Sequence, residues 1–430
     1  MRFWAVILLA ACVWGQSLSD EANTVLARAR EHVLHTTTRL PKYVCQETIN
    51  RTYLAPTHAI FPRAGVCPAI LGKDNPKMRI LATDRLRLDV AVFEGGELDS
   101  WPAASKFDSR SISDIVTSGP ISTGAFGINL MQVFENAGAK FELTGVESED
   151  GSRVFLYHYT VPVETSHYMV WTLAGTQLKT AYSGDFDVVE QTGELERLKI
   201  ETGLLPVEAG MCRAQTTNFY HRVTVGDGEF LIPLRSILRT IRLDGTATES
   251  VTTFSGCHEY GAESTIRFDQ DDDAGAAGPA GAAAQPAQPL PWATEVVLKL
   301  DSSLDTDTMA AGDIVWARIA APVRKPKSKA VALPAGVRVR GRVIQALHSI
   351  AANQGFDIVL EFDRYELDRA GVPFAAILKP GRARLAGTEV SFHPAEGGGK
   401  LSIRTKASRI VLPRGLESKW MTISPPKTRS

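Results

Sequence analysis

The apolar residues near the start of the chain recur with the period of a helix. Within residues 18–39 they fall at spacings of three and four, which places them in one stripe: Ala22, Val25, Leu26, Ala29 and Val33. Pro41 cannot continue a helix, because its ring removes a backbone donor and clashes with the preceding turn. The pattern therefore predicts an amphipathic helix over 18–39 that packs its stripe on another element.

Beyond this helix the period changes to two. In residues 85–93, apolar side chains alternate with charged ones, as in a strand with one buried face: Leu86, Leu88, Val90 and Val92. The same alternation recurs in six later segments, which are 153–163, 177–189, 194–202, 218–225, 229–238 and 248–256. Turn signals at Gly151, Gly193, Gly226–Gly228 and Gly245 separate most of them. Successive strands joined by short turns predict an antiparallel meander.

Two short helices are expected inside this meander, within residues 110–137. Their apolar positions are Ile112, Ile115 and Val116, then Leu130, Val133 and Phe134. A sheet that is polar on one face must cover its other face with helices or close on itself. Residues 18–268 are therefore predicted to form an α+β domain, a long helix on a large antiparallel half-barrel sheet.

A second domain is expected after a linker. Residues 269–291 are rich in Ala, Gly and Pro, cannot bury a core and indicate a disordered linker. Residues 292–424 then contain five strand-like segments between Gly and Pro turns, at 294–304, 313–323, 338–347, 356–367 and 373–381. They predict a smaller all-β, barrel-like domain, so the fold class of the whole chain is mainly β.

The first fifteen residues are typical of a secretory signal peptide. Arg2 precedes a short apolar run, which is too short to cross a bilayer, and Gly15 offers a small residue for cleavage. Alternatively, Leu9-Ala10-Ala11-Cys12 matches the lipobox of bacterial lipoproteins, in which Cys12 is the candidate for lipidation. No later segment is apolar for long enough to span a membrane. We expect an exported protein of the periplasm, the outer membrane or the extracellular space.

The remaining cysteines predict two disulfides. Cys45, Cys67, Cys212 and Cys257 are an even number of thiols in an exported chain, and they allow three connectivities. Proximity in the sequence favours Cys45–Cys67 and Cys212–Cys257. No C-x-x-C spacing is present, so a zinc ribbon or a thioredoxin-like site is not expected.

The net charge of −1 hides two oppositely charged halves. From residue 291 onward, 22 Lys/Arg stand against 13 Asp/Glu, about +9, and the remainder has 25 against 35, about −10. The two halves attract each other, or the basic part contacts an anionic envelope surface. The chain shows no nucleic-acid-binding motif, so nucleic acid is not an expected partner.

The segment Cys257-His258-Glu259 sets out the side chains of a thiol protease or a metal site. Neighbouring side chains of a strand point to opposite faces, so Cys257 and His258 cannot form a thiolate–imidazole pair. His32 and His35 have metal-compatible spacing but no third ligand, and we interpret them as solvated helix residues. The sequence therefore predicts no catalytic residue, no metal ligand and no cofactor.

Two pairs of acidic residues invite a comparison with the paired carboxylates of glycosidases. Asp185 with Asp187, and Glu194 with Glu196, share strand faces. Both pairs flank a hairpin turn, where exposed charges are expected. We interpret them as surface charges.

Three sets of segments in the chain resemble known groups of proteins. "AYSGDFDVVEQTGELERLKIE" followed by "LLPVEAG" resembles the periplasmic lipoprotein carriers, whose half-open sheet holds acyl chains on its apolar concave face. "YVCQET", "DRLRLDVAV", "GPISTGAFG" and "CHEYGAEST" resemble uncharacterised secreted proteins, mainly from acidobacteria. "VVLKLDSSLDTDTMAAGDIVWARIAAPV" with "LPAGVRVRGRV" resembles the β-barrel module of type IV secretion core-complex proteins, an oligomerising scaffold. This chain lacks the transmembrane anchor and proline-rich arm of the last group.

These observations leave three functional hypotheses. The first is non-catalytic binding of a lipid, a lipoprotein or another apolar ligand by the N-terminal sheet, and the sequence does not indicate which residues bind it. The second is a structural or assembly scaffold of the envelope, and the third is an enzyme acting on glycans. An open concave pocket on the apolar face would favour the first hypothesis, and a face filled by the protein's own helices would favour the second.

Overall fold

A computed structural model describes the chain over residues 4–58, 66–72, 77–93, 96–104, 112, 116, 119–149, 151–259, 290–324, 331–367, 370–385 and 387–423. The chain folds into two compact units. The first consists of Met1–Arg79, Asp89–Ser100 and Phe107–Ser264, and the second of Ile80–Leu88, Trp101–Lys106 and Thr265–Ser430. The expected linker lies, up to residue 289, outside the described residues, so its disorder and the domain boundaries stay predictions.

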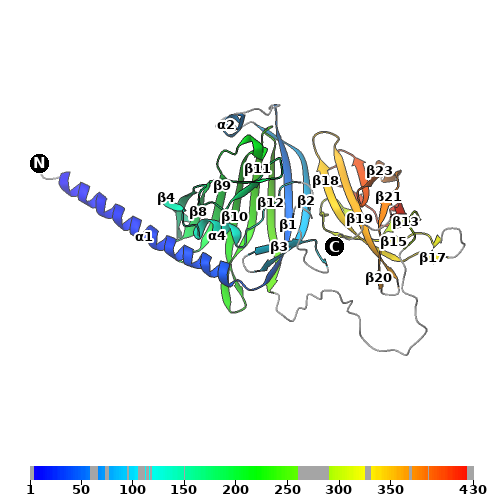
Figure 1. Cartoon of the computed structure of the whole chain (residues 1–430), viewed down its shortest axis with the longest axis horizontal. Coiled ribbons are helices and arrows are strands. Elements are labelled where there is room, and N and C mark those ends of the chain that lie inside the picture. The colour runs from blue at the N-terminus through cyan, green and yellow to red at the C-terminus, as the bar shows by residue number, and fades with distance from the viewer. Residues whose placement is uncertain are drawn as a thin grey trace. The chain divides into compact units, whose positions relative to one another are not determined.

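The first unit is built on a large antiparallel sheet, as the alternating pattern predicts. Its strands lie in the order β4, β5, β8, β9, β10, β11, β12, β1, and then the end of β2 with β3 (Figure 1). Their bounds are β1 Tyr43–Pro56, β2 Met78–Phe93, β3 Gly96–Ser100, β4 Lys140–Glu149, β5 Ser152–Val161, β8 Tyr182–Val189, β9 Leu195–Thr202, β10 Met211–Val225, β11 Gly228–Arg242 and β12 Ala247–Glu259. The predicted hairpin turns join β4 to β5, β8 to β9, β10 to β11 and β11 to β12.

Two helices cover the inner face of this sheet. The helix α1, Trp4–Arg39, includes the predicted helix 18–39 and buries four members of the predicted stripe, each at most 4% exposed: Ala22, Val25, Ala29 and Val33. The helix α4, Ile128–Phe134, is the second of the two predicted short helices. The first of those lies largely outside the described residues. No described helix is long and apolar enough to cross a membrane.

One glycine shows how tightly the strands of this sheet fit together. Gly184 lies on β8 opposite Tyr159 of β5. A Cβ atom at Gly184 would come 1.8 Å from the carbonyl oxygen of Lys199 and 3.0 Å from the Tyr159 ring. The hydroxyl of Tyr159 donates to the same carbonyl oxygen at 2.8 Å. Only a residue without a side chain allows this approach, which explains the glycine of the sequence Tyr182-Ser-Gly-Asp-Phe186.

Smaller elements complete the first unit. These are the helix α2, Val66–Leu71, the hairpin of β6, Met169–Trp171, with β7, Gln177–Lys179, and the 3-10 helix η1, Val207–Ala209. The outward side chains of β6 and the adjoining turn are apolar and exposed, with Trp171 at 62% and Leu173 at 72%.

The regular elements among the described residues of the second unit are all strands. They are β13 Glu295–Leu300, β14 Leu304–Asp305, β15 Ile314–Ile319, β16 Val323–Arg324, β17 Val331–Leu333, β18 Arg338–Ser349, β19 Gly355–Leu367, β20 Ala370–Pro373, β21 Ala376–Leu378, β22 Gly381–Leu385, β23 Thr388–Ala395, β24 Gly398–Arg404, β25 Val411–Leu412 and β26 Glu417–Thr422. The ladder β21–β26–β13–β15–β18–β19–β24–β23–β22 surrounds a core centred on Trp420, which is 0% exposed and contacts the Phe362 ring edge-on. Each of the five predicted strand segments contributes at least one strand to this ladder.

The sequence did not predict that the second unit also takes in residues 80–88, the beginning of β2. There Ala82, Thr83 and Asp84 pair with the end of β18, and Arg87 and Ala311 share a backbone hydrogen bond of 2.7 Å. The period of β2 shows which of its side chains are buried, but the strands that accept its hydrogen bonds are far away in the sequence. Only the three-dimensional pairing assigns this segment.

Candidate functional site

The inner face of the first unit's sheet carries a cluster of aromatic residues. Phe155, Tyr157 and Tyr159 alternate along β5 and are at most 3% exposed, and Phe186 of β8 is 0% exposed. The Phe186 ring stacks on Tyr157 at 4.9 Å between centroids and meets Phe134 of α4 edge-on at 5.1 Å. The aromatic face is therefore filled by the protein's own side chains.

Tyrosine hydroxyls bind this face to the helices that cover it. Tyr157 donates to the carbonyl oxygen of Ala22 in α1 at 2.6 Å, and Tyr182 donates to that of Gln132 in α4. Burial raises the pKa of Tyr182 to about 12 and that of Tyr157 further, so both stay protonated as donors. The centre of the sheet thus meets the condition that favours a scaffold, and any open ligand site must lie beside the helices.

Such a site lies beside α4. A pocket of about 700 Å³, lined mostly by apolar atoms, opens between α4 and the segment that connects β5 to β6. Ile128, which is 40% exposed, and Met131 contribute its apolar wall from α4, and Ala137 lies at its edge. Its size falls within the range of pockets that hold small ligands.

The polar side of this pocket contains two atoms without partners. Gln132 Oε1 and Thr165 Oγ1 are both shielded from solvent, and neither makes a hydrogen bond. The neighbouring Asn136 is satisfied, because its amide donates to the carbonyl oxygen of Thr165 at 2.8 Å and accepts from the backbone N–H of Gly138 at 2.9 Å. An orphaned buried polar atom costs about 1–3 kcal/mol, and it commonly marks a place where a ligand or water bonds.

The predicted helix histidines line a smaller pocket of about 340 Å³ beside α1. His32 Nδ1 lies 3.3 Å from the carbonyl oxygen of Gly193, and the His35 ring stacks on Phe230 at 5.4 Å. Arg222 closes this end through ion pairs with Glu194 at 2.7 Å and Glu229 at 2.8 Å. Within the described part of the chain, no group of three or more His, Cys, Asp or Glu is placed to hold a metal ion.

Sequence reasoning missed a group of one buried and two half-buried acids in the same unit. Glu47 of β1 is 3% exposed, and Glu97 and Asp99 of β3 are half-buried. Burial and then the neighbouring charges of Asp99 and Glu97 raise the pKa of Glu47 well above its ordinary value. Burial and then the charge of Glu97 raise the pKa of Asp99 to about 7. The alternation of Tyr43, Cys45, Glu47 and Ile49 was a signal, because it places the glutamate on the buried face.

Residues 119–126, most of the "GPISTGAFG" segment, lie over these acids and the polar part of the inner face. Glu97 accepts hydrogen bonds from the backbone N–H groups of Gly124 and Phe126 at 2.5 and 2.7 Å, and these bonds lower its pKa against the larger effect of burial. The hydroxyl groups of Ser122 and Ser236 lie 2.8 Å apart. The segment therefore crosses the strands and is held to them by these hydrogen bonds.

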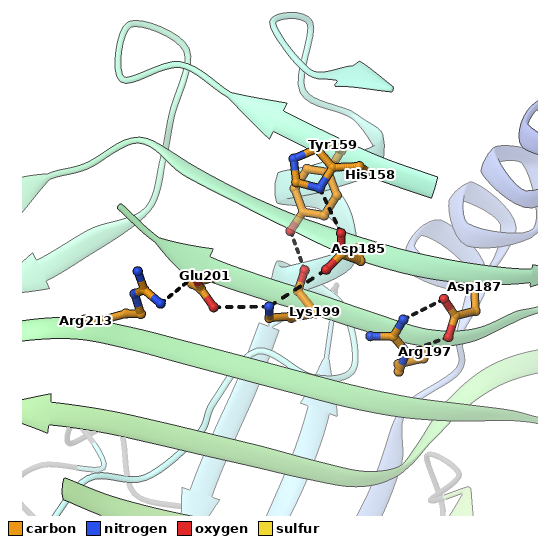
Figure 2. A network of polar contacts seen from close by, with 8 residues as sticks. All are labelled: His158, Tyr159, Asp185, Asp187, Arg197, Lys199, Glu201 and Arg213. Atoms are coloured by element: carbon orange, nitrogen blue, oxygen red, sulfur yellow. Dashed lines mark hydrogen bonds and ion pairs between the residues drawn. The ribbon is translucent and has the colours of Figure 1, made fainter. Parts of the chain in front are cut away.

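Asp185 and Asp187 lie in a network of ion pairs on the outer face of the sheet, whereas Glu194 lines the smaller pocket beside α1. Figure 2 shows Asp185 beside His158, with 2.8 Å between Oδ1 and Nδ1, and Asp187 accepting hydrogen bonds from Nε and Nη2 of Arg197. Glu201 links Lys199 at 3.1 Å to Arg213 at 3.0 Å on the next strand. Glu194 pairs with Arg222, as described above, and Glu196 also has a partner. Asp185, Asp187, Glu194 and Glu201 are therefore engaged in cross-strand pairing.

Cys257 of the Cys-His-Glu segment forms a disulfide with Cys45, and Cys67 forms one with Cys212. The connectivity favoured by sequence proximity is wrong, because β1 pairs with β12 and brings the two cysteines to a Cα–Cα distance of 4.1 Å. Gly256, at φ +60°, forms a bulge there, so that two residues of β12 lie opposite Cys45. His258 Nδ1 lies 2.9 Å from the carbonyl oxygen of Gly256. The side chain of Cys12, the candidate for lipidation, lies outside the described residues.

No protein-family model matches the sequence, and no curated protein matches it. Among solved structures, a LolA superfamily protein from Nitrosomonas europaea aligns over 56% of this chain and 94% of its own, at 12% identity and a TM-score of 0.26. A putative outer membrane lipoprotein-sorting protein domain from Vibrio parahaemolyticus aligns over 54% and 91%, at 14% identity and a TM-score of 0.26. A DUF1329 family protein from Desulfovibrio piger aligns over 55% and 92%, at 13% identity and a TM-score of 0.25. At these TM-scores the similarities carry no argument about function.

Proposed function

We propose that the chain is an exported, non-catalytic protein of the bacterial envelope whose first unit binds an apolar or amphipathic ligand, such as a lipid or the acyl chain of a lipoprotein. The observation that carries the proposal is the pocket beside α4, which combines a volume of about 700 Å³ with mostly apolar walls. Burial of an apolar chain there is favourable by about 25 cal/mol per Å² of surface removed from water.

The helix α4, which forms one wall of this pocket, is short. A helix of seven residues such as α4 is not stable by itself and depends on its packing. Leu130, Val133 and Phe134, each at most 1% exposed, supply that packing on the aromatic face. A ligand that replaces some of these contacts shifts α4 and gains access to the aromatic residues below. In this proposal, the arrangement in which α4 covers the aromatic residues is the ligand-free state of the binding site.

A non-catalytic role is supported by the state of the suspected reactive groups. Cys257 is in a disulfide, and Asp185 and Asp187 are in ion pairs on the outer face. The basic C-terminal part, about +9 from residue 291, is proposed to dock the protein to an anionic envelope surface. Salt-dependent binding of the full chain to vesicles with anionic lipid, absent with zwitterionic lipid, tests that second part.

Native mass spectrometry of the full chain purified from its host is the decisive experiment. Co-purified acyl species are expected. Ala137→Trp, which fills the mouth of the pocket, should lower lipid uptake about tenfold, equal to about 1.4 kcal/mol. Ala27→Trp on the exposed side of α1 is the matched control and should leave uptake unchanged.

A structural or assembly scaffold is the second candidate. It is favoured by the filling of the aromatic face by α1 and α4. Protein that carries no lipid, and takes up none as wild type or as Ala137→Trp, would replace the binding proposal with this one.

A further inference from the structure

We infer that the pocket beside α4 selects amphiphiles whose polar end is an uncharged or cationic hydrogen-bond donor, and that it discriminates against anionic ends. This inference rests on the proposed binding function and specifies the chemical class of its ligand. Hydroxyl, amide and ammonium groups at the end of an apolar chain belong to this class.

The first argument is the pair of unpartnered oxygens in the pocket wall. Gln132 Oε1 is an acceptor only, and Thr165 Oγ1 accepts as well as donates. Both residues line the pocket, and their two oxygens are shielded from water and make no hydrogen bond. A donor on the ligand then supplies a bond that the empty protein lacks, which relieves a buried unsatisfied acceptor.

The second argument is charge. None of the described residues that line this pocket is a lysine or an arginine, and His167 is the one basic residue among them. One of them, Glu135, is a carboxylate at the exposed rim, where its Oε1 accepts a hydrogen bond from Thr37 at 3.4 Å. A carboxylate or phosphate on the ligand would lose its hydration without gaining a permanent cation, and would face Glu135. An ammonium group would meet a complementary charge.

Four amphiphiles with the same twelve-carbon acyl or alkyl chain separate these two arguments. Monolauroylglycerol is an uncharged donor, dodecylammonium a cationic donor, methyl dodecanoate uncharged without a donor, and dodecanoate an anion. Each is titrated below its micelle-forming concentration against the full chain at neutral pH, by displacement of an uncharged naphthylamine fluorophore. We expect both donors to bind about tenfold more tightly than methyl dodecanoate, and dodecanoate to bind most weakly.

Variants assign the effect to the pocket. Gln132→Leu and Thr165→Val keep the shape of the site and remove the acceptors, so each should reduce the tenfold advantage of monolauroylglycerol over methyl dodecanoate to about threefold or less. Gln177→Leu on the exposed face of β7 is the matched control. Comparable far-ultraviolet circular dichroism and melting temperatures show that each variant is folded, and a folded Thr165→Val variant suffices if Gln132→Leu does not fold.

The outcomes distinguish the inference from the function on which it rests. Equal binding of all four compounds, or dodecanoate binding as tightly as the donors, would overturn the inference and leave ligand binding in place. An unchanged donor preference in both variants would likewise overturn it. Displacement by none of the four would remove the proposed function itself.

Discussion

The half-buried carboxyl of Asp99 makes the stability of the first unit depend on pH. Asp99 lies on β3 opposite Val90, which is 0% exposed, and its pKa is about 7 in the folded chain against 3.8 for an ordinary aspartate. Burial is the main cause of this shift, and the charge of Glu97 is the second. The folded chain therefore holds a proton at pH values where the unfolded chain has lost it.

The sign and the size follow from this difference. The contribution of protonated Asp99 to the free energy of unfolding is fully present below pH 3.8, the pKa of this side chain in the unfolded chain. It is lost as the pH rises through about 7, the pKa in the folded chain. A shift of about three units corresponds to at most about 4 kcal/mol of unfolding free energy at pH 8. Asp99→Asn keeps an uncharged side chain at every pH, and it also removes the charge that raises the pKa of Glu47. The variant should equal the wild type at pH 4 and exceed it at pH 8.

Urea unfolding of the full chain between pH 4 and pH 8 measures this effect. The tyrosine band of near-ultraviolet circular dichroism reports the first unit, because all described tyrosines except Tyr365 belong to it. Asp20→Asn, at an exposed position of α1, is the matched control. If the difference between Asp99→Asn and wild type were the same at pH 4 and pH 8, the assignment of the proton to Asp99 would be refuted.

Three further changes test the fold and the interpretation of the outer face. Gly184→Ala places a methyl group against a backbone carbonyl of β9 and should cost about 2–3 kcal/mol in thermal or urea unfolding, so an unchanged melting temperature would contradict the packing. Replacing Cys45 and Cys257 together with serine opens a cross-link over 212 residues and should cost about 2–5 kcal/mol, and a thiol titration of denatured, unreduced wild type should find Cys257 blocked. A double-mutant cycle on Asp187 and Arg197 should give a coupling of about 1 kcal/mol or less, as expected for a solvated pair, and a much larger value would reopen a special role for these carboxylates.

Much of the first unit is predictable from local periodicity. The spacing of Ala22, Val25, Ala29 and Val33 predicted both the helix and its buried stripe, because a helix repeats its faces every 3.6 residues. The glycines of the hairpin turns predicted antiparallel neighbours, because a turn of a few residues can join two consecutive strands of a sheet only in antiparallel orientation. At residue 257 a bulge interrupts the alternation, and the disulfide with Cys45 is what occupies the thiol.

The candidate site was not predictable in the same way. Met131 and Gln132 belong to a seven-residue helix, and Thr165 to a connection between strands, with no motif joining them. Their proximity arises because α4 packs on strands that come later in the chain. The acidic group was predictable in part. The alternation in β1 places Glu47 on the buried face, but its neighbours Glu97 and Asp99 come from a strand that is distant in the sequence.

By itself the sequence determined the periods, the turns, the even set of thiols and the opposite charges of the two halves, because these depend on residues close together in the chain. Tertiary structure alone decided that Cys45 bonds to Cys257, that residues 80–88 pair with β18, and that α1 and α4 fill the aromatic face. Each of these results depends on which distant strands become neighbours. That choice is made by the total of backbone hydrogen bonds and buried side chains across the sheet, and no single segment encodes it.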